Sequence, residues 1–102
     1  MNVQTFAPLY AGEARSRVRA MKPGEALIYH IGELGRDAGL DVEIRRLQCV
    51  LLEAGTPSGH PIYVDEQHNK RVKASFGLGL GTLTQRRLGA GMFEYIFTRG
   101  RK

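Results

Sequence analysis

Residues 82–98 read TLTQRRLGAGMFEYIFT and carry the clearest structural signal of the chain. Both ends of this stretch contain β-branched and aromatic residues, which favour strands. The small residues Gly89-Ala90-Gly91 between them are typical of a tight hairpin loop. Three aromatic residues alternate along the second half and share one face: Phe93, Tyr95 and Phe97. The pattern predicts two antiparallel strands, 82–88 and 92–98, joined as a hairpin.

Upstream of this hairpin, apolar residues recur with helical spacing in two stretches. The first predicts a helix over residues 10–21, and the second predicts helical structure over residues 33–54. Gly39 interrupts the second stretch, and Asp41 is suited to cap the helix that follows it. Between the two stretches, residues 25–31 form a short apolar run with β-branched and aromatic side chains, which predicts a strand.

Residues 62–76 allow two interpretations. As a hairpin, the apolar residues at the two ends of this segment would pair across a turn near Asn69. As a helix, Asp65 would cap the start, and the basic residues near the end would suit the helix dipole. We favour the helix. We expect the glycine-rich stretch GLGLG, residues 77–81, to lead the chain from it into the hairpin.

The length of 102 residues predicts a single domain spanning residues 1–102. The apolar fraction of 42% and the charged fraction of 25% are those of a globular protein, which excludes global disorder. We expect residues 1–9 to form a flexible arm and residues 99–102 a basic tail. The predicted helices and strands together define an α+β domain.

The charge balance points to a polyanionic partner. Fifteen lysines and arginines stand against ten acidic residues, a net charge of +5, and such an excess attracts phosphates. The single cysteine, Cys49, cannot form an intramolecular disulfide, which favours a reducing compartment. The sequence shows neither a signal peptide nor an apolar stretch of 18 residues. We therefore expect a cytoplasmic protein that does not associate with a membrane.

The order of the predicted elements is helix, strand, helix, helix and hairpin, and in this order the chain resembles winged helix-turn-helix regulators. The hairpin residues 81–96 and the early strand residues 26–30 carry this resemblance. The segment YHIGEL at 29–34, together with Gln85-Arg86-Arg87, is also similar to small uncharacterised temperate-phage proteins. The resemblance implies three helices on a small antiparallel sheet with a C-terminal hairpin. It also implies a small transcriptional regulator that binds double-stranded DNA, with a homodimer as one possible form.

The candidate DNA-binding residues come from the polar segment before the hairpin and from the hairpin itself. In the winged-helix arrangement the third helix lies in the major groove and the hairpin touches the phosphate backbone. Glutamine and asparagine can bond adenine, whereas arginine and lysine can bond guanine or phosphate. The candidates are Gln67, Asn69, Lys70, Arg71, Lys73, Arg86, Arg87 and Arg99. A purely solvated surface is the alternative interpretation of these charges.

Residues that would mark an enzyme are not recognisable in this sequence. It has neither a Gly-x-Ser-x-Gly motif nor a phosphate-binding Walker loop, and Cys49, His60 and His68 lack zinc-ligand spacing. We expect no catalytic activity, no cofactor and no metal. The alternative function is a phage-encoded interaction module that binds and inhibits a host or defence protein. In that case the aromatic strand 93–97 and the glycine-rich stretch would form the contact.

Overall fold

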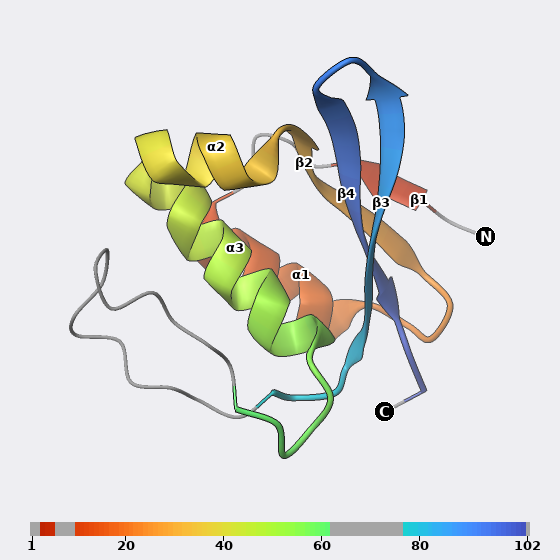
Figure 1. Ribbon diagram of the computed structural model, residues 1–102. Coiled ribbons are helices and arrows are strands. Elements are labelled where there is room, and N and C mark those ends of the chain that lie inside the picture. Colours follow the sequence, from red (N-terminus) through yellow and green to blue (C-terminus); the bar gives the residue numbers. More distant parts are fainter. Residues whose placement is uncertain (1–2, 6–9, 62–76, 102) are drawn as a thin grey trace.

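The computed structural model describes residues 3–5, 10–61 and 77–101, and within them three helices lie on one face of a four-stranded sheet (Figure 1). The elements are β1 (Val3–Thr5), α1 (Ala11–Ala20), β2 (Ala26–Gly32), α2 (Leu34–Leu40), α3 (Val42–Gly55), β3 (Gly81–Gly89) and β4 (Met92–Arg99). The α+β class predicted from the sequence is confirmed.

The predicted hairpin is confirmed as β3 and β4, which pair antiparallel from Gly81 opposite Arg99 to Gly89 opposite Met92. The strand order across the sheet is β1-β2-β4-β3, so β4 is central and β3 is an edge strand. The side chain of Phe97, on β4, is fully buried beneath the helices. The last strand along the chain therefore holds the sheet together.

The early strand β2 pairs antiparallel with β4 on one side and parallel with β1 on the other. β2 matches the strand predicted over residues 25–31. β1 was not predicted: within the segment 1–9, expected to be a flexible arm, Val3–Thr5 is a strand that pairs with residues 26–28. Pairing to a buried neighbour, rather than the weak sequence pattern of three residues, fixes this strand.

The helices predicted over residues 10–21 and 33–54 form close to their predicted bounds. In α1, Ala14 and Val18 are buried one turn apart, and the arginines of the helix are exposed. The long helical stretch breaks into α2 and α3 at Asp41, as predicted. The Asp41 carboxylate accepts a hydrogen bond of 2.9 Å from the backbone N–H of Glu43, which caps the start of α3.

The hydrophobic core lies between the helices and the inner face of the sheet. Its fully buried large side chains are Leu27, Leu47, Leu51 and Phe97, which come from β2, α3 and β4. The alternation of β4 directs Phe97 and Tyr95 towards the helices, and Tyr29 and Leu83 pack into the same cluster. The shared burial of side chains from both layers fixes the position of the hairpin relative to α3.

Residues 77–80 form a strap that crosses the end of α3. The backbone N–H of Leu78 donates to the carbonyl of Glu53 at 3.0 Å, and that of Leu80 donates to Ala54 at 2.9 Å. These bonds satisfy carbonyls that a helix end leaves without partners. The strap leads into β3 at Gly81, where any Cβ would collide with the carbonyl oxygen of Thr98. The glycine-rich stretch therefore lets the backbone pack closely, and its leucines line the surface beside α3.

The segment 62–76, interpreted from the sequence as a helix or a hairpin, lies outside the described residues. Three helices precede it in the chain. Since α1, α2 and α3 already supply three helices before the hairpin, α3 is the third helix of the described fold.

Candidate nucleic-acid interface

The hairpin carries two of the predicted site residues, Arg86 and Arg87, on opposite faces of β3. Arg86 is paired across the sheet with Glu94, and its Nη2 lies 2.5 Å from the Glu94 Oε1. The Arg86 side chain is 67% exposed, whereas the Glu94 side chain is only 12% exposed. Much of the charge of Arg86 is therefore balanced by a carboxylate of its own sheet.

Arg87 lies on the other face of the strand, opposite Phe93. Its Nε donates a 3.3 Å hydrogen bond to the carbonyl of Gly89, which orients the side chain along the end of the hairpin. Among residues 10–61 and 77–101, no carboxylate forms an ion pair with Arg87. Within the described ranges, the exposed charge of Arg87 therefore has no carboxylate partner.

The end of the hairpin is apolar. Leu88 is 46% exposed and Met92 is 49% exposed, on the two sides of the turn. Figure 1 shows that this end of β3 and β4 projects beyond α2. The hairpin thus presents an exposed apolar end next to Arg86, which is paired with Glu94, and Arg87, which has no ion pair among the described residues.

Arg99 lies far from this end. It is paired with Gly81 at the opposite end of the hairpin, about 20 Å from Arg87 at the usual rise of a strand. Its Nη1 donates to the carbonyl of Val18, in the last turn of α1, at 3.1 Å. A cation is favourable at the carboxyl end of a helix. The structure therefore places Arg99 in the packing of α1 on the sheet and does not bring it together with Arg86 and Arg87.

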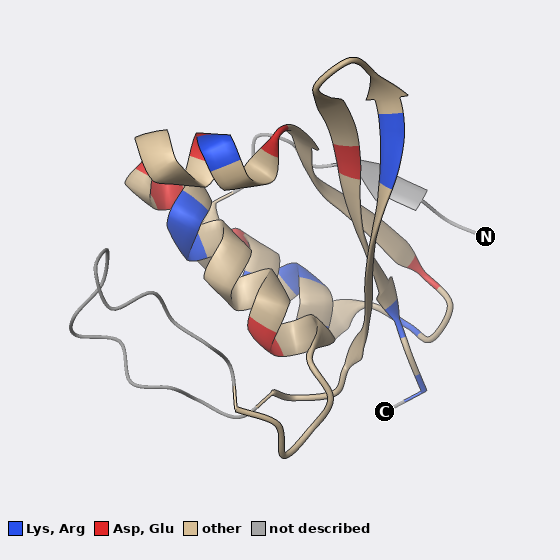
Figure 2. Ribbon diagram, viewed as in Figure 1, with Lys and Arg blue, Asp and Glu red and all other residues tan. Residues whose placement is uncertain are grey.

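The exposed side of α3, the third helix, carries balanced charge. Arg46 Nη1 lies 2.9 Å from Glu43 Oε1, and Arg45 Nε donates to the carbonyl of Ala38 at 3.2 Å. The five predicted site residues of the segment 62–76 lie outside the described residues: Gln67, Asn69, Lys70, Arg71 and Lys73. Figure 2 shows the arginines and lysines of the described chain spread over the helices, the hairpin and the end of β4.

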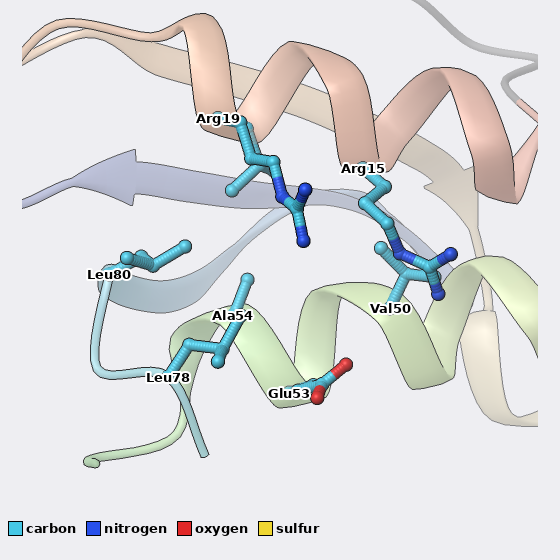
Figure 3. Close-up of a pocket in the computed structure, with 8 residues that line it drawn as sticks. Arg15, Arg19, Val50, Glu53, Ala54, Leu78 and Leu80 are labelled. Carbon is cyan, nitrogen blue, oxygen red and sulfur yellow. The ribbon is translucent and has the colours of Figure 1, made fainter.

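Two arginines of α1 differ from most of the other arginines in what surrounds them. Arg15 and Arg19 line a pocket beside α3 (Figure 3), and within the described part of the chain neither forms an ion pair. The sequence showed these residues on a helix but not what they face. That information depends on the packing of α1 against α3, which no local pattern specifies.

A polar pair joins the end of β2 to α2. His30 Nε2 lies 2.8 Å from Asp37 Oδ2, and the hydrogen bond from His30 lowers the pKa of the Asp37 carboxyl. Next to it, the hydroxyl oxygen of Tyr95 accepts a 3.0 Å hydrogen bond from the backbone N–H of Leu34. Burial raises the pKa of Tyr29, close by, to about 12. The cluster attaches the start of α2 to the sheet and contains no activated nucleophile.

Comparisons with known proteins give no match: no protein-family model, no curated protein and no solved structure matches this chain. In the described ranges, no set of three or more His, Cys, Asp or Glu side chains is placed to hold a metal ion. The helices of these ranges also include none with the length and apolar character needed to cross a membrane.

Proposed function

We propose that this protein binds double-stranded DNA as a winged helix-turn-helix regulator. The observation that carries the proposal is the order α1-β2-α2-α3-β3-β4, in which β2 pairs with β4 and the hairpin projects past the helices. This is the element order that the resemblance implies. The net charge of +5 supports a polyanionic partner.

In this proposal α2 and α3 form the helix-turn-helix, and α3 replaces the segment 65–76 as the helix that enters the major groove. The hairpin then contacts the phosphate backbone through Arg87, which has no competing carboxylate in the described structure. Arg86 contributes less because Glu94 holds its guanidinium. Arg99 contributes to folding rather than to DNA contact, since it bonds the end of α1.

The test is the salt dependence of binding to a labelled 20-base-pair duplex of random sequence, measured by fluorescence anisotropy between 50 and 200 mM KCl. Each phosphate neutralised adds about 0.9 to the steepness of log affinity against log salt. We expect Arg87→Gln to lower this slope by about one. Lys22→Gln is the matched control, because it removes one charge near Arg99, at the opposite end of the sheet. Absence of binding at 50 mM KCl would refute the proposal.

Exposed apolar side chains support a second proposal, a protein-interaction module. Leu40 is 82% exposed and Val42 is 50% exposed at the junction of α2 and α3, in addition to Leu88 and Met92 on the hairpin. The contact cannot use all of the aromatic strand, because Phe97 is fully buried and Tyr95 faces the helices. Of the three rings, Phe93 is half-buried and lies outside the core cluster, so it is the one that such a contact could use.

The two proposals differ in what the hairpin end does. Leu88→Ser combined with Met92→Ser should abolish capture of a protein partner from nuclease-treated lysate in 0.5 M KCl while leaving the DNA salt slope unchanged. Capture that survives this double substitution would contradict the second proposal. If the unsubstituted protein captures the partner only from lysate that has not been treated with nuclease, then DNA, and not the hairpin end, held the partner.

A further inference from the structure

A pocket of about 280 Å³ lies between α1, α3 and the strap 77–80 (Figure 3). Its apolar lining comes from all three: Val18, Val50, Ala54, Leu78 and Leu80. Its charged lining is Arg15 and Arg19 from α1 and Glu53 from α3. The pocket therefore combines an apolar floor with a charged rim, as small-molecule sites generally do, and its volume suits a ligand of fragment size.

The two arginines are one helical turn apart, so both guanidinium groups point from α1 towards α3 (Figure 3). Like charges at this spacing repel one another and destabilise a helix. In the described structure, neither arginine is within ion-pair distance of Glu53 or of any other carboxylate. Even counting Glu53, the rim has an excess of one positive charge, which a bound anion would balance.

The apolar floor decides which anion fits. Val18 and Ala54 are almost fully buried, and Leu80 packs against the same core cluster. A free phosphate ion would leave this floor unfilled, whereas an apolar body attached to the anion would cover it. A planar guanidinium matches a carboxylate through two parallel hydrogen bonds, and two guanidinium groups can share its oxygens.

We propose that this pocket binds a small carboxylic acid with an apolar body, its carboxylate held by Arg15 and Arg19 and its body on Val50, Ala54 and Leu80. Glu53 acts against binding, because its carboxylate adds negative charge to the same rim. The site shares α3 with the proposed DNA-binding helix, but its α3 residues lie beside α1 and the strap 77–80, and none of its residues belongs to α2 or to the hairpin end (Figure 3).

The first experiment titrates the isotopically labelled protein with 3-phenylpropionate and follows the backbone amides by NMR. We expect saturable shifts at Val50, Ala54 and Leu80, with a dissociation constant of about 1 mM for a ligand of this size. The uncharged 3-phenylpropanamide and the apolar-free acetate should each bind at least about tenfold more weakly. The absence of saturable shifts in this pocket up to 10 mM, or equal affinity for the amide, would overturn the proposal.

The second experiment uses three pocket variants, two expected to weaken binding and one expected to strengthen it, and a fourth variant as control. Arg15→Gln and Arg19→Gln should each weaken 3-phenylpropionate binding by about tenfold, because each removes a charged donor. Glu53→Gln should strengthen it by about threefold, because it removes the competing negative charge. Arg101→Gln, an exposed arginine outside the pocket, should leave it unchanged. Weaker binding by Glu53→Gln, or equal losses in all arginine variants, would contradict the proposed site.

Discussion

His30 Nε2 lies 2.8 Å from Asp37 Oδ2, and this hydrogen bond ties the end of β2 to the middle of α2. The ionised carboxylate accepts the bond, so the imidazole N–H donates it. The bond lowers the pKa of Asp37, and the nearby charge of Arg36 adds to the effect. A carboxyl whose pKa is lower in the folded than in the unfolded protein stabilises the fold at a pH above its unfolded-state pKa. This stabilisation is lost as the pH falls through its folded-state pKa.

We expect Asp37→Asn to lower the free energy of unfolding by about 1–2 kcal/mol at pH 7. The difference from wild type should persist at pH 5 and shrink below about pH 4, near the ordinary value for aspartate. Urea unfolding at pH 7, 5 and 3 measures this. Glu13→Gln, at an exposed site on α1, serves as the control. A difference that stays constant down to pH 3 would show that ionisation of Asp37 has no part in the stability.

Glu94→Gln should strengthen DNA binding, because it frees the guanidinium of Arg86. The expected gain is about fivefold at 100 mM KCl, with the salt slope steeper by about one. The free energy of unfolding should change by no more than about 1 kcal/mol, since the Arg86 side chain of the ion pair is exposed. The same anisotropy titration gives the result. An unchanged slope would mean that this face of the hairpin does not approach phosphate.

Arg99→Gln should reduce stability and leave DNA binding by the folded protein unchanged. The substitution removes the hydrogen bond to the Val18 carbonyl at the end of α1, at a cost of about 1–2 kcal/mol. Thermal or urea unfolding measures the loss, and the DNA salt slope supplies the second readout. Lys22→Gln, an exposed cation after α1, should change stability by less than about 0.5 kcal/mol. A drop of one in the DNA slope of Arg99→Gln would place this arginine at the DNA.

Two glycine substitutions should change stability in opposite directions. Gly81→Ala forces a methyl group against the carbonyl of Thr98 and the ring of Phe97, and we expect a loss of more than about 2 kcal/mol. Gly35 lies within α2 with open space where its Cβ would be, so Gly35→Ala should stabilise the protein by about 0.5–1 kcal/mol. Circular-dichroism melts of both variants measure the effect. A stable Gly81→Ala protein would contradict the close packing of the start of β3 against β4.

The elements with a strong local pattern were predictable from the sequence. The hairpin followed from a compact glycine-containing loop between alternating residues, and the helices followed from their periodicity and from the cap at Asp41. β1 was missed because three residues carry too little pattern. It forms by pairing with β2, a contact between segments some twenty residues apart.

The candidate site was less predictable than the fold. The sequence identified Arg86, Arg87 and Arg99 as cations but could not show that Arg86 faces Glu94 or that Arg99 reaches the end of α1. Both facts depend on the register of β3 against β4 and on the packing of α1. The pocket of Arg15, Arg19 and Glu53 arises from three segments that only the tertiary structure brings together.

The position of β4 in the sheet determines when the protein can fold during its synthesis. β4 follows every other element of the fold, yet it lies between β2 and β3 and contributes the buried Phe97. Until the ribosome has released these residues, β2 and β3 have no shared partner and the apolar sides of the helices remain in water. The nascent chain therefore reaches its native state only after its last strand has emerged. Until then it depends on chaperones, or on rapid completion of synthesis and folding, to avoid aggregation.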